Sequence, residues 1–301
     1  MAHWCHGPAA APDLPCDVDG APVSAPTVTA SLPPRSPGGS LRHEPALDGI
    51  RALAVVMVLL FHGGVSWVRG GYVGVSVFFT LSGFLITRLL LTEHDRSGRI
   101  DLGRFYARRL RRLVPAGLLC LLLVIVAAEA GWFTGVEDLR RDVTGALLQA
   151  ANWVSLAGSD SYADLLAKVG GGDPSPVAHF WSLAIEEQFY WLWPLVLLVV
   201  VLRGRPSARA TTLRIGAITV AAALAAPAIG RLYGADAAYW ATPARVGEIL
   251  VGGLLAAVVH ERTVRGVPID RRVSWLAAPG LTGVLAAAVA FPASSGQRTR
   301  A

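Results

Sequence analysis

Apolar residues in this chain form long continuous runs rather than the alternating pattern that is typical of strands. From about residue 45 onward, seven runs are each long enough to cross a bilayer core of roughly 30 Å as a helix. They cover residues 46–66, 71–91, 113–133, 180–202, 213–232, 244–261 and 273–291. The pattern predicts an all-α fold, a polytopic transmembrane helical bundle of about seven spans.

The composition supports a membrane protein. Hydrophobic residues make up 53% of the chain and charged residues only 16%, which is too apolar for an ordinary soluble domain. The formal net charge of +6 comes from arginine, since Lys168 is the only lysine. These arginines gather beside the apolar runs, which indicates a topology signal rather than a nucleic-acid-binding surface. We therefore expect the lipid bilayer as a partner, and no nucleic acid.

Three connections between the predicted spans hold most of the arginines. They follow the second, fourth and sixth spans, so they lie on one side if the spans alternate. Arginine-rich loops face the cytoplasm, which predicts a multi-pass protein of the plasma membrane with a cytoplasmic N-terminus. The segment 137–157 is short and amphipathic, and a full crossing there would invert every later loop. We expect it to lie on the outer face or to dip into it.

The two ends of the chain differ from its middle. Residues 1–43 are rich in Pro, Ala and Ser without an apolar period, which predicts a disordered tail. Residues 44–291 contain the runs and form the predicted membrane domain, and residues 292–301 form a polar tail. Cys5, Cys16 and Cys120 show no paired spacing, so we predict no disulfide, no metal site and no cofactor.

The first apolar run carries two ionisable residues. Arg51 and His62 are eleven positions apart, which on a helix places them within about 20° of one face and roughly 16 Å apart along the axis. Ionisable residues inside a membrane helix are costly unless they face a bundle interior or a wet cavity. The pair therefore marks a candidate functional site.

Four arginines stand directly before the third run, in the segment FYARRLRRLVP. One interpretation is a topology determinant that contacts lipid headgroups. The other is a cytoplasmic phosphate clamp, because guanidinium groups bind phosphate through two parallel hydrogen bonds. Both interpretations stay open for the four residues, which are Arg108, Arg109, Arg111 and Arg112.

The segment HFWSLAIEEQFYWLWP, from His179 to Pro194, places several polar groups in an apolar run. In a helix, His179, Ser182 and Glu186 share one face at the outer end of the span. Glu186 and Glu187 lie at membrane depth, where an unpaired charge is costly, so at least one needs a partner. The concentration of polar residues favours function over a purely structural role.

Two further segments allow alternatives. Arg245 and Glu248 are three residues apart at the start of the sixth run, and they form either a local ion pair or part of a polar site. The second run carries Ser82 among other small residues, which we interpret as helix-packing positions. A nucleophilic serine is disfavoured because the G-x-S-x-G pattern is lacking around Ser82.

These segments together resemble the acyltransferase-3 family of integral-membrane acyltransferases. Five segments occur here in the family's order, LDGIRALAVVMVLLFH, FFTLSGFLIT, FYARRLRRLVPA, HFWSLAIEEQFYWLWP and TPARVGEILVGG, and the resemblance covers roughly residues 44–291. Members O-acylate cell-surface polysaccharides, peptidoglycan, lipopolysaccharide and some antibiotics. The resemblance implies an enzyme with acyl-CoA as donor substrate and a carbohydrate or small-molecule acceptor, the acyl group being acetyl in the simplest case.

The resemblance also assigns expected roles. In the family the arginine and histidine of the first helix are essential, and the basic motif before the third helix engages acyl-CoA. Arg51 and the four clustered arginines would therefore face the donor. The W-S-L-x-x-E-E-Q-F-Y segment would line the acceptor side or support the histidine, which gives such roles to Trp181, Ser182 and Tyr190, with His179, Arg245 and Glu248 beside them.

A mechanism follows as a hypothesis from these roles. His62 would act as general base on the acceptor hydroxyl, since the ordinary pKa of histidine, about 6.5, lies near operating pH. Glu186 or Glu187 would orient its imidazole. The alternatives are a transporter or flippase of a sugar or small solute, because polar residues in helices also mark transport routes, and an inactive fragment. Members commonly have about ten spans, so we expect the membrane domain to be incomplete at its C-terminus.

Overall fold

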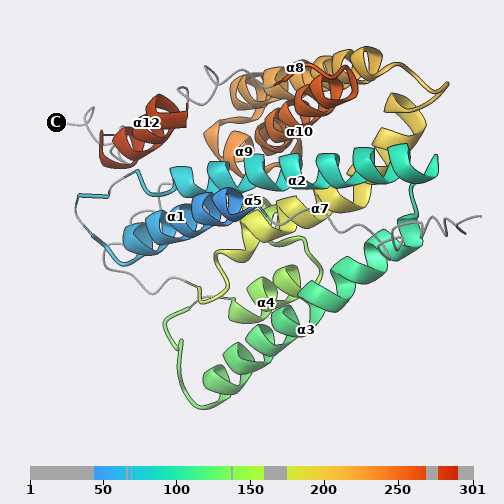
Figure 1. Ribbon diagram of the computed structural model, residues 1–301. Coiled ribbons are helices and arrows are strands. Elements are labelled where there is room, and N and C mark those ends of the chain that lie inside the picture. Colours follow the sequence, from blue (N-terminus) through green and yellow to red (C-terminus); the bar gives the residue numbers. More distant parts are fainter. Residues whose placement is uncertain are drawn as a thin grey trace, which may run out of the picture. The chain divides into compact units, whose positions relative to one another are not determined.

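The computed structural model describes residues 44–65, 67–68, 70–136, 138–158, 175–268 and 277–290. The predicted tails, 1–43 and 292–301, lie outside the described residues. Within the described part, all regular structure is helical: α1 (Pro45–His62), α2 (Val73–Ser97), α3 (Leu102–Glu129), α4 (Leu139–Leu147), α5 (Ala151–Ala157), α7 (Phe180–Val196) with a π-helical continuation η1 (Leu197–Val201), α8 (Ala208–Tyr233), α9 (Ala235–Trp240), α10 (Thr242–Val264) and α12 (Ala277–Ala290) (Figure 1).

Six of the helical stretches are long and apolar enough to cross a membrane. They are α1, α2, α3, α7 with η1, α8, and α9 with α10. In α1, α3 and α8 only 11% of the most apolar window is buried inside the protein, so their exposed leucines and valines face outward, as lipid-facing side chains do. The chain is a multi-pass helical membrane protein. The seventh predicted span, 273–291, lies partly outside the described residues, and its described part is the 14-residue helix α12.

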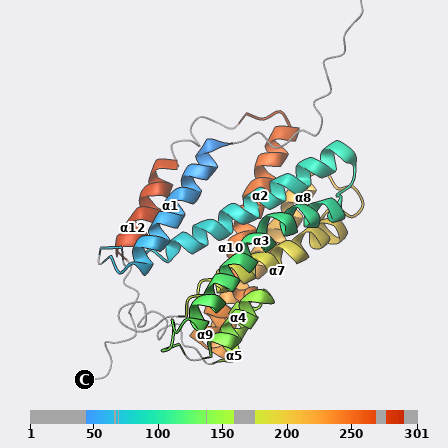
Figure 2. The same cartoon turned by 90° about the horizontal axis from the view of Figure 1, so that it is seen from below.

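Helix α2 packs closely against α10 near the middle of the bundle (Figures 1 and 2). A Cβ atom added to Gly83 would lie 1.7 Å from the carbonyl oxygen of Ile249, and one added to Gly252 would lie 1.8 Å from that of Thr80. The two backbones therefore touch, which only glycine permits, as in the small-residue interfaces of membrane helices. The small residues of the second run are packing positions, as predicted.

Large aromatic and aliphatic side chains of α2, α7 and α10 fill the space around this crossing. Phe79, Ile185, Trp240 and Ile249 are completely or almost completely buried. The indole N–H of Trp193 donates a hydrogen bond of 2.9 Å to the hydroxyl of Thr87. The core that positions the polar residues of α7 is thus built mainly from these three helices.

The segment 137–157 forms two short helices rather than a span. Helices α4 and α5 have nine and seven residues, whereas about 20 are needed to cross a bilayer. The structure agrees with the prediction that this segment does not cross. Its position on the outer face stays a prediction.

A buried hydrogen-bond network fastens α5 to α7 and α10. The amide nitrogen of Asn152 donates to the backbone carbonyl of Trp240 and to the hydroxyl of Thr242, both at 3.0 Å. Its amide oxygen accepts from the side chain of Gln188 at 3.0 Å. The Gln188 oxygen accepts from the indole of Trp153 at 3.1 Å and from Thr242. Asn152 is fully buried, so this network fixes the position of a segment too short to span the membrane.

Candidate active site

The two adjacent glutamates of α7 contact two different helices. The hydroxyl of Ser82 on α2 donates a hydrogen bond of 2.9 Å to Oε1 of Glu186. The guanidinium of Arg109 on α3 lies 3.9 Å from the carboxylate of Glu187. Arg51 on α1 is close enough to Glu186 to interact with it electrostatically. Four helices therefore meet at these two carboxylates.

Arg109 also lies over an aromatic ring of α7. Its guanidinium carbon is 3.3 Å from the centroid of the Tyr190 ring, a cation–π contact that adds to its attraction for Glu187. The side chains of Arg109 and Glu187 are only 23% and 13% exposed. We call Arg51, Ser82, Arg109, Glu186, Glu187 and Tyr190 the central cluster.

His62 lies at the C-terminus of α1, at the end of the bundle where α2 begins. Its Nδ1 is 2.8 Å from the carbonyl oxygen of Val58, and its ring is exposed. His179, the residue before α7, lies near enough to sense the charge of His62: burial first, and then that charge, lower the pKa of His179. The hydroxyl of Ser182 donates to the carbonyl of His179 at 3.2 Å. We call this the His62 end.

Arg245 and Glu248 form an ion pair of 2.8 Å near the start of α10. The guanidinium carbon of Arg245 lies 5.7 Å from the ring of Phe79, 5.8 Å from that of Trp181 and 5.4 Å from that of Tyr239. The pair is thus local, at helical spacing, and also faces the aromatic core. Both sequence interpretations describe part of this arrangement.

The four clustered arginines belong to a helix and do not act alike. They form the early turns of α3, which begins at Leu102 and continues through Pro115. Arg109 points into the central cluster, whereas Arg108, Arg111 and Arg112 are exposed. A helix necessarily separates neighbouring residues by about 100°, so one basic motif supplies both a buried cation and an exposed basic surface.

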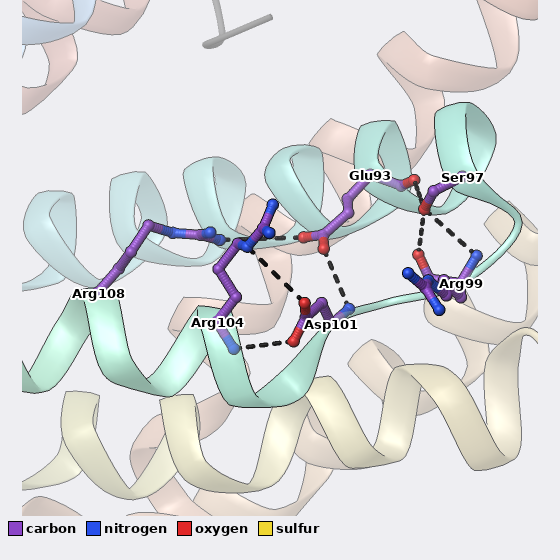
Figure 3. Close-up of polar contacts among 6 residues, drawn as sticks. All are labelled: Glu93, Ser97, Arg99, Asp101, Arg104 and Arg108. Carbon is purple, nitrogen blue, oxygen red and sulfur yellow. Dashed lines mark hydrogen bonds and ion pairs between the residues drawn. The ribbon is translucent and has the colours of Figure 1, made fainter. Parts of the chain in front are cut away.

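A hydrogen-bonded turn between α2 and α3 sets where this motif begins (Figure 3). The carboxylate of Asp101 caps α3 by accepting from the backbone N–H of Arg104 at 2.9 Å, and Glu93 accepts from the N–H of Asp101 at 3.0 Å. The hydroxyl of Ser97 donates to the carbonyl of Glu93. Arg108 lies 4.0 Å from the Glu93 carboxylate, which holds it loosely at the surface. We call this the α2–α3 end; α2 separates it from the His62 end.

The predicted site residues therefore fall into four groups rather than one. The contacts of Glu186 and Glu187 are with Ser82 and Arg109, and that of the His62 ring is with the backbone of its own helix. A glutamate that orients His62 stays a prediction. Sequence reasoning missed the hydrogen-bonding role of Ser82 and the whole of Asn152. Within the described residues, no group of three or more His, Cys, Asp or Glu side chains is arranged to hold a metal ion.

Comparison with known proteins identifies the family that shares this arrangement. The profile of a family described as an acyltransferase domain matches residues 44–299. The chain belongs to the acyltransferase-3 family. No solved structure matches it. As a family member, it carries the first-helix Arg and His, the basic motif of α3 and the glutamates of α7 on three different helices.

Similar curated proteins are bacterial O-acetyltransferases. The chain is 41% identical over 160 residues to the peptidoglycan O-acetyltransferase OatA of Listeria monocytogenes, covering 53% of this chain and 25% of that protein. It is 36% identical over 221 residues to the putative peptidoglycan O-acetyltransferase YrhL of Bacillus subtilis, covering 72% and 33%. For the O-acetyltransferase OatA of Staphylococcus aureus the identity is 39% over 167 residues, covering 56% and 27%. The matches thus span a quarter to a third of these relatives.

Arg109→Ala is expected to lower the free energy of unfolding by about 3 kcal/mol, because it leaves the carboxylate of Glu187 buried without a cation. Arg111→Ala is the matched control, since Arg111 is exposed on the same helix, and it should change stability little. Unfolding of the purified chain in detergent measures both. The double variant Arg109→Met with Glu187→Leu should recover most of the loss; equal instability of all three variants would contradict the assignment.

Proposed function

We propose that the chain is an integral-membrane O-acyltransferase that moves an acetyl group from cytosolic acyl-CoA to a hydroxyl of a cell-surface glycan. The observation that carries this proposal is the family match over residues 44–299. The names of the relatives make a peptidoglycan sugar the first acceptor to test. The separation between the exposed arginines at the α2–α3 end and the histidine at the His62 end supports a donor side and an acceptor side.

The hydrogen bond of His62 prepares its imidazole to act as a base. A carbonyl oxygen can only accept, so the bond to Val58 assigns the proton to Nδ1 in the neutral ring. Nε2 is then left with its lone pair. In the proposed step, Nε2 takes the proton of the acceptor hydroxyl while the hydroxyl oxygen attacks the thioester carbonyl. The bond between the acyl carbon and sulfur breaks, and the CoA thiolate leaves and takes up the proton.

The exposed arginines fit the phosphate groups of the donor. Guanidinium groups bind phosphate oxygens strongly and in pairs, and Arg108, Arg111 and Arg112 are accessible on α3. The pantetheine arm of CoA would carry the thioester from there towards His62. Arg51 and the carboxylates of the central cluster would line that path, with Glu186 held by Ser82.

The direct test uses membranes that contain the chain, acetyl-CoA labelled in the acetyl group, and a peptidoglycan acceptor. We expect label to appear as an alkali-labile ester on the sugar and to depend on the chain. Movement of a solute across the membrane without covalent transfer would favour the transporter alternative. Absence of both, at normal abundance in the membrane, would contradict an active enzyme.

Replacing both Arg111 and Arg112 by glutamine is expected to raise the KM for acetyl-CoA by about tenfold or more, because charge-assisted hydrogen bonds to phosphate are lost. The kcat should change less, since these residues lie away from His62. The control is Arg209→Gln, an arginine in the first turn of α8. An unchanged KM in the double variant would remove these residues from the donor site.

A further inference from the structure

Two ion pairs inside the helical bundle keep polar atoms without partners. Nε of Arg109 and Oε1 of Glu187 are buried without a hydrogen bond, and so are Nε of Arg245 and Oε2 of Glu248. Buried polar atoms in proteins are almost always bonded, and exceptions point to a missing partner. The first pair belongs to the central cluster. The second pair has no part in the mechanism above.

The second pair offers one donor and one acceptor side by side. Nη1 of Arg245 is engaged with Oε1 of Glu248 at 2.8 Å, which leaves the guanidinium Nε–H to donate and Oε2 to accept. The side chains remain 17% and 31% exposed, so the pair can be reached. A phosphate would meet the carboxylate unfavourably, because the charges of the pair cancel. An uncharged hydroxyl group both accepts and donates and fits this pair.

Aromatic rings surround the pair. Phe79 and Trp181 are buried, whereas Tyr239 is only half-buried and has its ring centroid 4.8 Å from that of Trp181. Small-molecule sites combine such apolar rings with a few convergent polar groups. The apolar face of a sugar ring can rest on Tyr239 while one of its hydroxyls reaches the ion pair.

The pair is held rigidly from behind. Between α9 and α10, Ala241 adopts an extended conformation, so the helix is broken just before Thr242. The carbonyl of Trp240 at this break accepts from Asn152, and Thr242 bonds to both Asn152 and Gln188. Broken helices at membrane depth are tolerated where the freed backbone groups are satisfied in this way, and they often border binding sites. Asn152 and Gln188 are thus positioning residues for Arg245.

The pair also lies in the half of the bundle that contains His62. Contacts between α2 and α10 run in the same direction along both helices, from Thr80 beside Glu248 to Asp95 beside His260. Helix α2 begins at the His62 end, so the first turns of α10 are near that end too. This is the side on which the proposed function needs the acceptor.

We propose that Arg245 and Glu248, together with Tyr239, form a subsite that binds a hydroxyl of the sugar acceptor. The proposal rests on the proposed function, which defines the acceptor. In this subsite the Arg245 Nε–H donates to the sugar hydroxyl oxygen, and the hydroxyl donates to Oε2 of Glu248. The sugar is bound here and is not chemically changed at this hydroxyl.

The test measures binding rather than transfer. The purified full-length chain in detergent is dialysed against the labelled, uncharged disaccharide of N-acetylglucosamine. Arg245→Gln and Glu248→Gln should each weaken its binding by about tenfold or more, as expected for hydrogen bonds to charged groups. Glu261→Gln is the matched control, because Glu261 forms a 3.2 Å ion pair with Arg265 on the same helix; it should bind normally. Binding of labelled acetyl-CoA should stay within about twofold in all variants.

The outcomes separate this subsite from the proposed function. Disaccharide binding that is absent in the wild-type chain, or equal in wild type and both variants, overturns the subsite and leaves a water molecule as the partner of these atoms. Binding that is lost in the variants supports the subsite even if no acetyl transfer is found. Because Arg245→Gln could fail to fold, phenylglyoxal labelling of Arg245 in the wild-type chain provides a second measurement. The disaccharide should protect Arg245, and unaltered labelling overturns the proposal.

Discussion

Replacing His62 by alanine should reduce acetyl transfer by about 10²-fold to 10⁴-fold, the range that general-base catalysis contributes. The reason is the free Nε2 of the ring, which the hydrogen bond from Nδ1 to Val58 leaves ready to accept a proton. The measurement is the rate of ester formation on the glycan at saturating acetyl-CoA, normalised to the amount of chain in the membrane. The KM for acetyl-CoA should change little, because the exposed arginines are unaltered.

The matched control for this variant is His260→Ala. His260 lies near the opposite end of the bundle, 3.5 Å from Asp95, and takes no part in the proposed step. It should retain nearly full activity. Full activity of His62→Ala at equal abundance would exclude His62 as the base, whereas a loss shared by both variants would indicate a general effect of removing an imidazole.

Gly252→Ala and Gly83→Ala are expected to have the largest effects on stability among single methyl additions. The new Cβ atoms would lie 1.8 Å from the carbonyl oxygen of Thr80 and 1.7 Å from that of Ile249. Both neighbours are backbone atoms, so α2 and α10 must move apart. We expect a loss of at least about 2 kcal/mol in the free energy of unfolding for each variant, measured by denaturation of the purified chain in mixed micelles.

Gly117→Ala is the control for these two variants. Gly117 lies within α3, and a Cβ atom there would meet nothing within 4 Å. The substitution should be neutral or slightly stabilising, because alanine is the better helix former. If Gly252→Ala were as stable as Gly117→Ala, the close contact between α2 and α10 would be refuted.

The helices were largely predictable because membrane spans announce themselves by length and apolarity. Six of the predicted runs fall within the candidate spans. The boundary at residue 113 was wrong for the third helix, which begins at Leu102, because arginines are good helix formers outside the apolar core and a hydropathy pattern does not register them. The break at Ala241 was also missed, since its stabilising partner Asn152 lies 88 residues from Trp240.

The site was predictable in its members more than in its contacts. Helical spacing placed Arg51 and His62 on one face, but it could not show that Glu186 bonds to Ser82, 104 residues away. The same limitation affected the arginine motif. Only the packing of α3 against α7 distinguishes the buried Arg109 from the exposed Arg111, because both belong to a uniformly basic sequence.

The hydrogen bonds of Asn152 also bear on how the chain enters the membrane. Helices α4 and α5 are too short to be retained as spans when they leave the ribosome, and the groups that hold α5 in place belong to Gln188, Trp240 and Thr242. All three are synthesised later. The segment can therefore reach its final place only after α7 and α10 have been inserted, so the order in which the bundle is assembled differs from the order in which it is translated.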